Sequence, residues 1–194
     1  MERRSEILRR TKETEIKVIL NLDGMGNYRI STGLPFLNHM LELFAKHGEI
    51  DLQIEGKGDL DVDPHHTVED IGISLGAALF SALGEKRGIR RYGYAVIPMD
   101  EALTLFAIDI SGRPHLTLRG TLRGKVGNFD VCLFKDFFQG FANESRTTIH
   151  IAVLWGKNPH HKVESMFKAF GTALKTATQL VRERGDIPST KGIL

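Results

Sequence analysis

The chain carries one short motif twice, first as His65-His66-Thr67-Val68-Glu69 and later as His160-His161-Lys162-Val163-Glu164. Each copy opens a segment whose large apolar residues recur every three or four positions, the spacing of a helix with one buried face. These apolar residues are Val68, Ile71, Leu75 and Leu79 in the first copy, and Val163, Phe167, Phe170 and Leu174 in the second. A proline precedes each pair of histidines, which suits a helix start. An internal duplication therefore decides the fold.

The similarity extends upstream of both motifs. A helical segment at Asn38–His47 aligns with Lys135–Glu144, so that His39 pairs with Asp136. After each helix comes a strand with alternating apolar residues, at Ile50–Ile54 in the first half and at Thr147–Ile151 in the second. Helix, strand and motif helix thus follow one another in the same order twice.

Each repeat also begins with a hairpin pattern. Glu13–Leu22 leads to the turn residues Asp23-Gly24, and Glu101–Ile110 leads at the same spacing to Ser111-Gly112. Together with the elements that follow, each half therefore reads β-β-α-β-α.

These repeats predict an α+β fold of two fused ferredoxin-like β-β-α-β-α half-domains, related by internal duplication and a pseudo-two-fold axis. The halves are expected at residues 1–89 and 90–194, in one structural unit, because no linker rich in proline, glycine or serine separates them. A length of 194 residues, with 41% hydrophobic and 26% charged residues, fits an ordinary globular protein.

Charge and cysteine content exclude several classes of function. The formal net charge of +2 is too small to indicate nucleic-acid binding, so anion binding must be local. The single cysteine, Cys132, excludes internal disulfides and thiolate metal clusters and agrees with a reducing cytoplasm. The charged start of the chain and the lack of long apolar runs predict neither a signal peptide nor a membrane span. We expect a cytoplasmic protein.

The duplicated motif predicts metal binding. Successive helix residues point about 100° apart, so two adjacent histidines do not easily hold the same ion, whereas His66 and Glu69 share a face. Two neighbouring sites follow. Because no cysteine lies nearby, nitrogen and oxygen ligands are expected, which suit manganese, iron, cobalt or zinc. Added carboxylates and open positions for substrate favour manganese.

Other motifs narrow the chemistry further. The chain lacks a nucleophile elbow, a dinucleotide-binding glycine pattern and a Walker loop. Arginine forks and Ser/Lys donors that suit a phosphate occur at Arg90-Arg91-Tyr92-Gly93, Ser111-Gly112-Arg113 and Pro188-Ser189-Thr190-Lys191. We therefore expect a reaction in which bound metal ions act on a phosphorylated substrate.

At this point the sequence resembles a known family, imidazoleglycerol-phosphate dehydratase, over nearly its whole length. The resemblance rests on Arg10-Thr-Lys-Glu13-Thr, Pro35-Phe-Leu-Asn-His39-Met-Leu, His65-His-Thr-Val-Glu-Asp70, Pro98-Met-Asp-Glu-Ala102, Ser111-Gly-Arg-Pro114, His160-His-Lys-Val-Glu164 and Pro188-Ser-Thr-Lys-Gly192. The resemblance implies two Mn²⁺ per active site, with other divalent metals possible, and no organic cofactor.

The resemblance also implies particular ligand sets. One manganese site is expected from His39, His66, Glu69 and His160, and the other from His65, Asp136, His161 and Glu164. The repeat alignment maps one set onto the other. Asp136 departs from the family pattern, which has histidine there, but a carboxylate can also bind a metal ion.

The resemblance further implies which residues meet the substrate. Substrate contacts are expected from Glu13, His39, His47, Arg91, Arg113, Lys168, Ser189, Thr190 and Lys191. Catalytic roles are expected for Glu13, His65, Glu69 and Glu164, with Glu13 as the proton-transfer residue. The implied reaction of histidine biosynthesis expels a hydroxyl as water through the imidazolate form of the substrate. A base then removes the adjacent proton, and the enol becomes the ketone imidazole acetol phosphate. A homo-oligomer of 24 subunits, with sites completed between subunits, is also implied.

Two other functions fit part of the pattern. Paired metals beside a phosphate pocket also occur in two-metal phosphohydrolases. Release of inorganic phosphate would support this function. A metal-binding or ferredoxin-like interaction module would explain the histidines but gives no reason for Arg113 and the Ser189–Lys191 segment.

Overall fold

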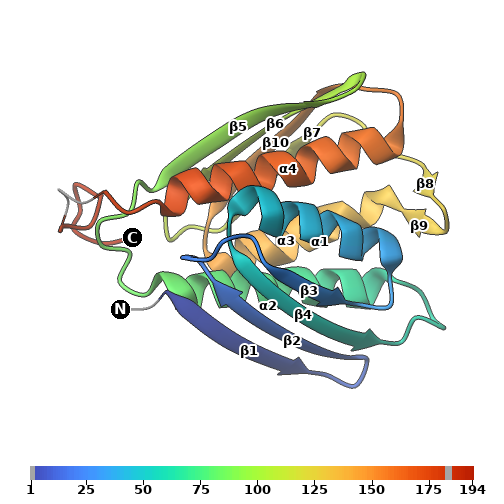
Figure 1. The fold of residues 1–194 in the computed structure, drawn as a ribbon, viewed down its shortest axis with the longest axis horizontal. Helices are drawn as coiled ribbons and strands as arrows, with labels where there is room; N and C mark the ends of the chain where they lie inside the picture. The colour runs from blue at the N-terminus through green and yellow to red at the C-terminus, as the bar shows by residue number, and fades with distance from the viewer. Residues whose placement is uncertain (1–2, 182–184) are drawn as a thin grey trace.

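Four helices lie between two four-stranded sheets that form the outer layers (Figure 1). The structure is a computed structural model and describes residues 3–181 and 185–194. The strand orders, β1-β2-β4-β3 and β5-β6-β10-β7, are equivalent under the repeat alignment. The predicted class, an α+β fold with two duplicated halves, is confirmed.

Both halves begin with a strand that was not predicted, which gives the shared order β-β-β-α-β-α, and the second half contains a further small hairpin. The first half consists of β1 (Arg4–Arg10), β2 (Thr14–Asn21), β3 (Tyr28–Ser31), α1 (Pro35–Gly48), β4 (Asp51–Gly58) and α2 (His65–Leu83). The second half consists of β5 (Tyr92–Met99), β6 (Ala102–Asp109), β7 (His115–Arg119), β8 (Lys125–Val126), β9 (Phe129–Asp130), the 3-10 helix η1 (Val131–Leu133), α3 (Phe134–Ser145), β10 (Thr148–Trp155) and α4 (Pro159–Thr178). The small β8–β9 hairpin and η1 occur only in the second half.

The two predicted hairpin turns are wrong. β2 pairs antiparallel with β1, whereas the chain after Asp23-Gly24 crosses to the far edge of the sheet, where β3 pairs parallel with β4. Likewise the chain after Ser111-Gly112 leads to β7, which lies parallel to β10. The true hairpins are β1–β2 and β5–β6.

The sequence analysis missed β1 because two of its three inward positions, Ser5 and Arg9, are polar and only Ile7 is apolar. The Ser5 hydroxyl is buried and donates a hydrogen bond of 2.7 Å to the carbonyl of Ala78 in α2. Four residues further along the same face, the Arg9 Nε atom lies 3.0 Å from an Asp70 carboxylate oxygen, also in α2. Polar pairs on either side of Ile7 therefore interrupt the apolar alternation by which a half-buried strand is ordinarily recognised.

The sequence analysis missed β5 because the small residues Gly93 and Ala95 face inward, whereas large residues such as Tyr92 and Tyr94 face outward. Tyr92 and Tyr94 are 57% and 75% exposed, whereas Ala95 is buried against the helices. A methyl group built on Gly93 would lie 1.9 Å from the carbonyl oxygen of Ala173 in α4. The close approach of α4 thus requires glycine at this position of the strand.

The helices pair across the two halves, α1 with α4 and α2 with α3. A methyl group built on Gly171 of α4 would lie 2.5 Å from the Phe44 carbonyl oxygen of α1. A methyl group on Gly76 of α2 would lie at the same 2.5 Å from the Phe141 carbonyl oxygen of α3. The two crossings are therefore close, equivalent and composed of one helix from each half.

The core lies between the helices and both sheets and is rich in phenylalanine. The Phe44 and Phe106 rings both stack on Phe170, with centroids 4.2 and 4.9 Å apart, respectively. The α3 residues Phe134, Phe137, Phe138 and Phe141 are fully buried, so this stretch belongs to the core. Among the described helices, none combines the length and apolarity needed to cross a bilayer.

Candidate metal centre

The first group of potential ligands, the α1–α4 cluster, consists of His39, His160 and Glu164. The His160 Nε2 atom lies 3.0 Å, and the His39 Nε2 atom 3.8 Å, from the same Glu164 carboxylate oxygen. One ligand atom from each residue lies within 4.8 Å of the other two, a geometry that suits a metal ion. The close crossing of α1 and α4 brings these residues together from opposite halves of the chain.

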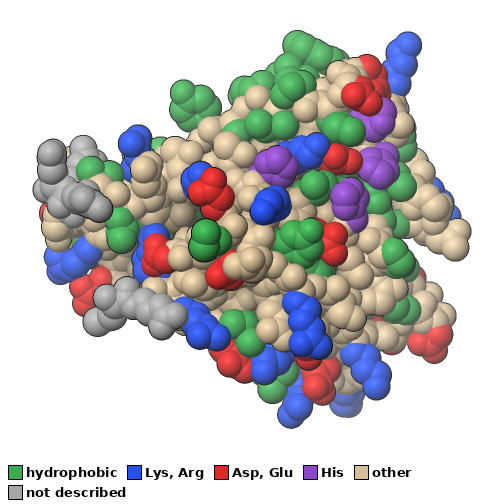
Figure 2. Space-filling model, in the orientation of Figure 1, with side chains coloured by type: hydrophobic (Ala, Val, Ile, Leu, Met, Phe, Trp, Pro, Cys, Tyr) green, Lys and Arg blue, Asp and Glu red, His purple; other side chains and the backbone are tan. Residues whose placement is uncertain are grey.

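The second group, the α2–α3 cluster, consists of His65, Glu69 and Asp136. The His65 Nε2 atom lies 3.8 Å from Glu69 Oε2, and its Nδ1 atom lies 3.7 Å from Asp136 Oδ2. Under the repeat alignment these three residues are the counterparts of His160, Glu164 and His39. The duplication has therefore produced two equivalent clusters, the second of them more open. Figure 2 shows histidine side chains gathered near acidic ones on one face of the molecule.

Within one chain these clusters differ from the predicted ligand sets. His39 lies beside His160, and His65 lies beside Asp136, as the predicted sets require. The glutamates, however, are exchanged: Glu164 belongs with His160 and Glu69 with His65, because the i,i+4 pair is closer here than the predicted i,i+3 pair. Neither predicted set of four is formed by a single chain within the described residues.

His66 and His161 point away from the two clusters toward carboxylates on neighbouring loops. The His66 Nδ1 atom lies 3.0 Å from Asp59 Oδ2 and 3.9 Å from Glu13 Oε2. The His161 Nδ1 atom lies 2.6 Å from Glu101 Oε2. Each histidine follows a cluster member by one residue, so the helix directs it about 100° away from that cluster.

The electrostatics of the α1–α4 cluster favour the ionised form of Glu164. Burial alone would raise the pKa of Glu164, but the hydrogen bonds and charges of Lys168 and His160 hold it below the ordinary value. The Lys168 ammonium lies 2.7 Å from the second Glu164 oxygen. Burial and the positive charge of Lys168 lower the pKa of His47, near the end of α1. Lys168 and His47, two of the predicted substrate contacts, therefore lie near Glu164 of the α1–α4 cluster.

The other predicted phosphate contacts lie at the opposite end of the molecule. The Arg91 Nε atom lies 2.7 Å from Asp109, its Nη1 atom donates to the Pro188 carbonyl at 3.0 Å, and its backbone N–H donates to Ala177 at 2.9 Å. Ala177 lies in the last turn of α4, whose first turn holds His160. A helix rise of 1.5 Å per residue separates the two residues by roughly 25 Å. Figure 1 shows the C-terminus at the end of the molecule remote from the start of α4.

Arg113 and the C-terminal segment share that remote end. A methyl group built on Gly112 would lie 2.6 Å from the carbonyl carbon of Leu194, and the Lys86 ammonium donates to the Leu194 carbonyl at 3.2 Å. The segment that contains Ser189, Thr190 and Lys191 therefore lies near Arg91 and Arg113. One chain does not unite these residues with either metal cluster.

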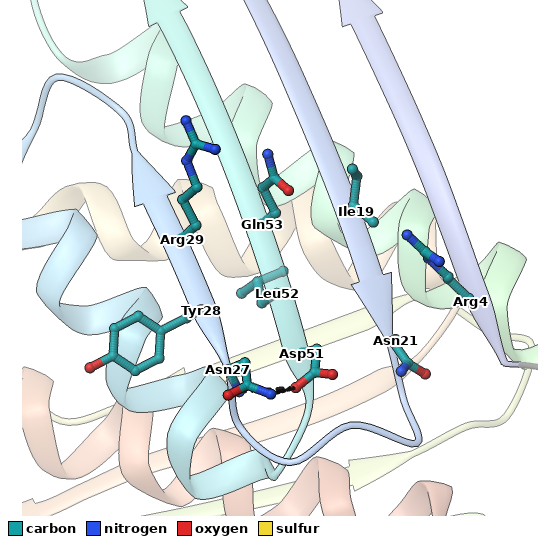
Figure 3. Close-up of a pocket in the computed structure, with 9 residues that line it drawn as sticks. All are labelled: Arg4, Ile19, Asn21, Asn27, Tyr28, Arg29, Asp51, Leu52 and Gln53. Carbon is teal, nitrogen blue, oxygen red and sulfur yellow. Dashed lines mark hydrogen bonds between the residues drawn. The ribbon is translucent and has the colours of Figure 1, made fainter.

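Two pockets have the size of a small-molecule binding site. One of about 530 Å³ lies beside His39 and is lined mainly by apolar residues, including Phe36 of α1 and Phe129 of β9. The other, of about 380 Å³, lies on the outer face of the first sheet, with Arg29, Asn27 and Asp51 among its lining residues (Figure 3). Asp51 Oδ1 already accepts three hydrogen bonds of 3.0 Å from residues 25 and 27, and no histidine lines this pocket, so the cluster side remains the better candidate.

Sequence reasoning missed two residues of this region, Asp59 and Glu101. Nothing in the sequence distinguishes Asp59 from its neighbours in a polar loop. Glu101 was detectable, because it aligns with Glu13 at the spacing that relates the two strands after them.

Comparisons with known proteins agree over the whole chain. The sequence model of the imidazoleglycerol-phosphate dehydratase family matches residues 32–174. An imidazoleglycerol-phosphate dehydratase of Pseudomonas fluorescens is 55% identical over 195 residues, which cover 100% of this chain and 99% of the relative. One of Hahella chejuensis is 54% identical with the same coverage.

Solved structures give the same result for the fold. The enzyme structure from Pyrococcus furiosus superposes with a TM-score of 0.84 at 40% identity, covering 97% of this chain and 100% of that one. The structure from Staphylococcus aureus gives a TM-score of 0.83 at 39% identity, covering 92% and 99%. Because sequence and fold match over nearly the full length, the chain belongs to the imidazoleglycerol-phosphate dehydratase family.

Proposed function

We propose that this hydro-lyase catalyses the metal-dependent dehydration of D-erythro-imidazoleglycerol phosphate to imidazole acetol phosphate, a cytoplasmic step of histidine biosynthesis. The observation that carries the proposal is the pair of equivalent clusters, each with imidazole and carboxylate groups at a helix crossing. Membership of the family supplies the substrate class.

The donor chemistry of the clusters fits divalent metal. Neutral imidazole and carboxylate are ligands that Mn²⁺, Fe²⁺, Co²⁺ and Zn²⁺ share, and the exposed, oxygen-rich α2–α3 cluster favours Mn²⁺. Two Mn²⁺ per active site would be held by residues on all four helices, namely His39, His65, His66, Glu69, Asp136, His160, His161 and Glu164. When bound, the metal supplies a Lewis acid that stabilises negative charge on the imidazole ring of the substrate.

A site completed by a second subunit would bring together the predicted ligands and substrate contacts that lie apart within one chain. His66 and Glu69 are predicted to join His39 and His160, yet within one chain they lie outside the α1–α4 cluster. The Arg91 and Arg113 end is remote from both clusters in the same chain. An assembly in which neighbouring copies meet at these surfaces, such as the 24-subunit shell of the family, would unite them.

Within such a site the chain's own residues would handle the protons. Dehydration removes the hydroxyl from the carbon next to the ring and a proton from the neighbouring carbon, and the resulting enol becomes a ketone. Glu13 is the proposed base for that proton, because its side chain is 55% exposed and its carboxylate lies beside, but does not hydrogen-bond to, His66. The cluster residues His65, Glu69 and Glu164 are the further proposed catalytic residues.

Phosphate binding is proposed for the basic and hydroxyl groups outside the clusters. These groups are Arg91, Arg113, Lys168, Ser189, Thr190 and Lys191, with His39 and His47 on the imidazole side. Arg91 is already paired with Asp109 and donates a hydrogen bond to the Pro188 carbonyl. We therefore propose that Arg91 holds the C-terminal segment in place in addition to contacting the phosphate.

One assay tests the proposal against its rivals. Manganese-loaded protein is incubated with imidazoleglycerol phosphate, and the keto product and free phosphate are followed together. Keto product without phosphate release supports the dehydratase. Phosphate release would favour a phosphohydrolase, and metal binding without turnover would favour a binding module.

Replacing Arg113 by methionine is expected to weaken substrate binding without loss of metal. Arg113 is exposed and remote from both clusters, and a charge-assisted contact to phosphate is worth about 1.5–3 kcal/mol, or roughly 10- to 100-fold in Kd. Substrate affinity and metal content of the assembled variant are measured side by side. Unchanged affinity would reject a phosphate contact for Arg113.

Acidification is expected to release the metal, beginning above the ordinary pKa of histidine. Asp59 raises the pKa of His66, and Glu101 raises the pKa of His161, from the usual 6.5. Because a raised pKa favours the protonated ring, which cannot ligate, proton competition starts at a higher pH than for an isolated histidine. The apparent Mn²⁺ affinity should fall between about pH 7.5 and 5.5 and recover on return to neutral pH. An affinity that stays constant over this range contradicts the expectation.

A further inference from the structure

Glu101, in the turn between β5 and β6, forms the tightest polar contact of the candidate site. Its Oε2 atom lies 2.6 Å from the His161 Nδ1 atom. Its Oε1 atom accepts hydrogen bonds from the backbone N–H groups of Lys157 and Asn158, at 2.9 and 2.7 Å. Both oxygens are therefore engaged, and they tie the start of α4 to the second sheet.

These contacts fix the state of the His161 ring. An ionised carboxylate only accepts, so the Nδ1 atom must carry the proton that it donates to Glu101. The Asn158 side-chain amide lies 3.4 Å from His161 Nε2, which agrees with a lone pair on that nitrogen. A metal requires that lone pair.

In the first half of the chain, a different residue forms the corresponding hydrogen bond to the histidine. The counterpart of His161 is His66, and the counterpart of Glu101 is Glu13. His66 nevertheless makes its hydrogen bond of 3.0 Å to Asp59, while the nearest Glu13 oxygen is 3.9 Å away. Asp59 comes from the loop before α2, which is two residues longer than the corresponding loop before α4.

We propose that the two repeat-related glutamates have different tasks. Glu101 is a positioning residue that presents the Nε2 atom of His161 to the metal. Asp59 does the same for His66, and this leaves the carboxylate of Glu13 free to exchange a proton with the substrate. The inference rests on the proposed function, since it takes His66 and His161 as metal ligands.

Mn²⁺ binding to the metal-free, full-length protein tests the division of tasks. Glu101→Gln keeps the size of the side chain but offers one acceptor oxygen for three donors. It should weaken one class of Mn²⁺ sites by about 10–100-fold, the usual effect of losing a hydrogen-bond partner of a ligating histidine. Asp59→Asn should do the same at the other class. The matched variant Glu13→Gln should leave Mn²⁺ affinity within about twofold but reduce turnover.

A double-mutant cycle separates positioning of His161 from anchoring of the loop. If Glu101 acts through His161, Glu101→Gln should add no further loss of Mn²⁺ affinity in a His161→Ala background. The full additional loss in that background would overturn the positioning role and indicate anchoring through residues 157 and 158. Unchanged Mn²⁺ affinity in Glu101→Gln, with metal lost in His161→Ala, would overturn the inference alone. Unchanged affinity in His161→Ala itself would instead overturn the ligand assignment in the proposed function.

Discussion

Removing divalent metal with a chelator is expected to abolish dehydration, and adding Mn²⁺ is expected to restore it. The imidazole and carboxylate groups of both clusters are expected to bind the reacting end of the substrate through a bound cation. Turnover should fall by more than the roughly 10–100-fold that follows loss of one supporting hydrogen bond at a metal site. Activity is measured against metal content, before and after addition of Mn²⁺, Zn²⁺ or Mg²⁺.

The same experiment reports on the assembly. Ligands contributed by separate chains would couple metal binding to subunit order, so the metal-free protein should be smaller or less stable in light scattering. Protein treated with chelator already saturated with Mn²⁺ is the control, since it experiences the chelator without losing metal. Full activity in protein whose metal content is below detection would falsify the metal dependence.

The sequence predicted the motif helices because their features are local. α2 and α4 begin near a proline and bury residues at helical spacing, such as Val68 and Val163, so each is visible without knowing its neighbours. β1 and β5 were missed because their patterns depend on their partners. The inward Arg9 is acceptable only because Asp70 faces it, and the inward Gly93 only because α4 lies so close.

The sequence indicated which residues gather at the helix crossings, but not how they are grouped within one chain. The duplicated motif named both histidine pairs, and the alignment of His39 with Asp136 placed one residue of each cluster on a separate helix. That α1 would pack on α4, rather than on the α2 of its own half, is decided by glycine contacts such as Gly171 against Phe44. No local pattern encodes such a crossing, so the grouping of Glu69 with His65 and of Glu164 with His160 within one chain lay beyond sequence reasoning.

Asp136 provides the sharpest test of the two clusters. Its carboxylate lies 3.7 Å from His65, and its side chain is 38% exposed, so it is open to an incoming ion. Asp136→Ala is expected to weaken metal binding at one of the two sites by on the order of 10–100-fold or more and to lower turnover accordingly. Asp136→His should restore both, because imidazole occupies the equivalent position in the α1–α4 cluster, as His39, and either group donates to Mn²⁺.

The histidine variant also separates ligation from a simpler role. Asp136 lies in the first turn of α3, where a negative charge stabilises a helix by about 0.3–1 kcal/mol. Histidine cannot supply that charge, so rescue of metal content by Asp136→His identifies a ligand, whereas a helix-stabilising carboxylate would not be rescued. Glu144→Ala, an exposed carboxylate near the end of the same helix, is the matched control and should retain both metals. If Asp136→Ala keeps full metal occupancy and activity in the assembled protein, Asp136 serves only the helix, and its predicted site retains His65, His161 and Glu164 as ligands.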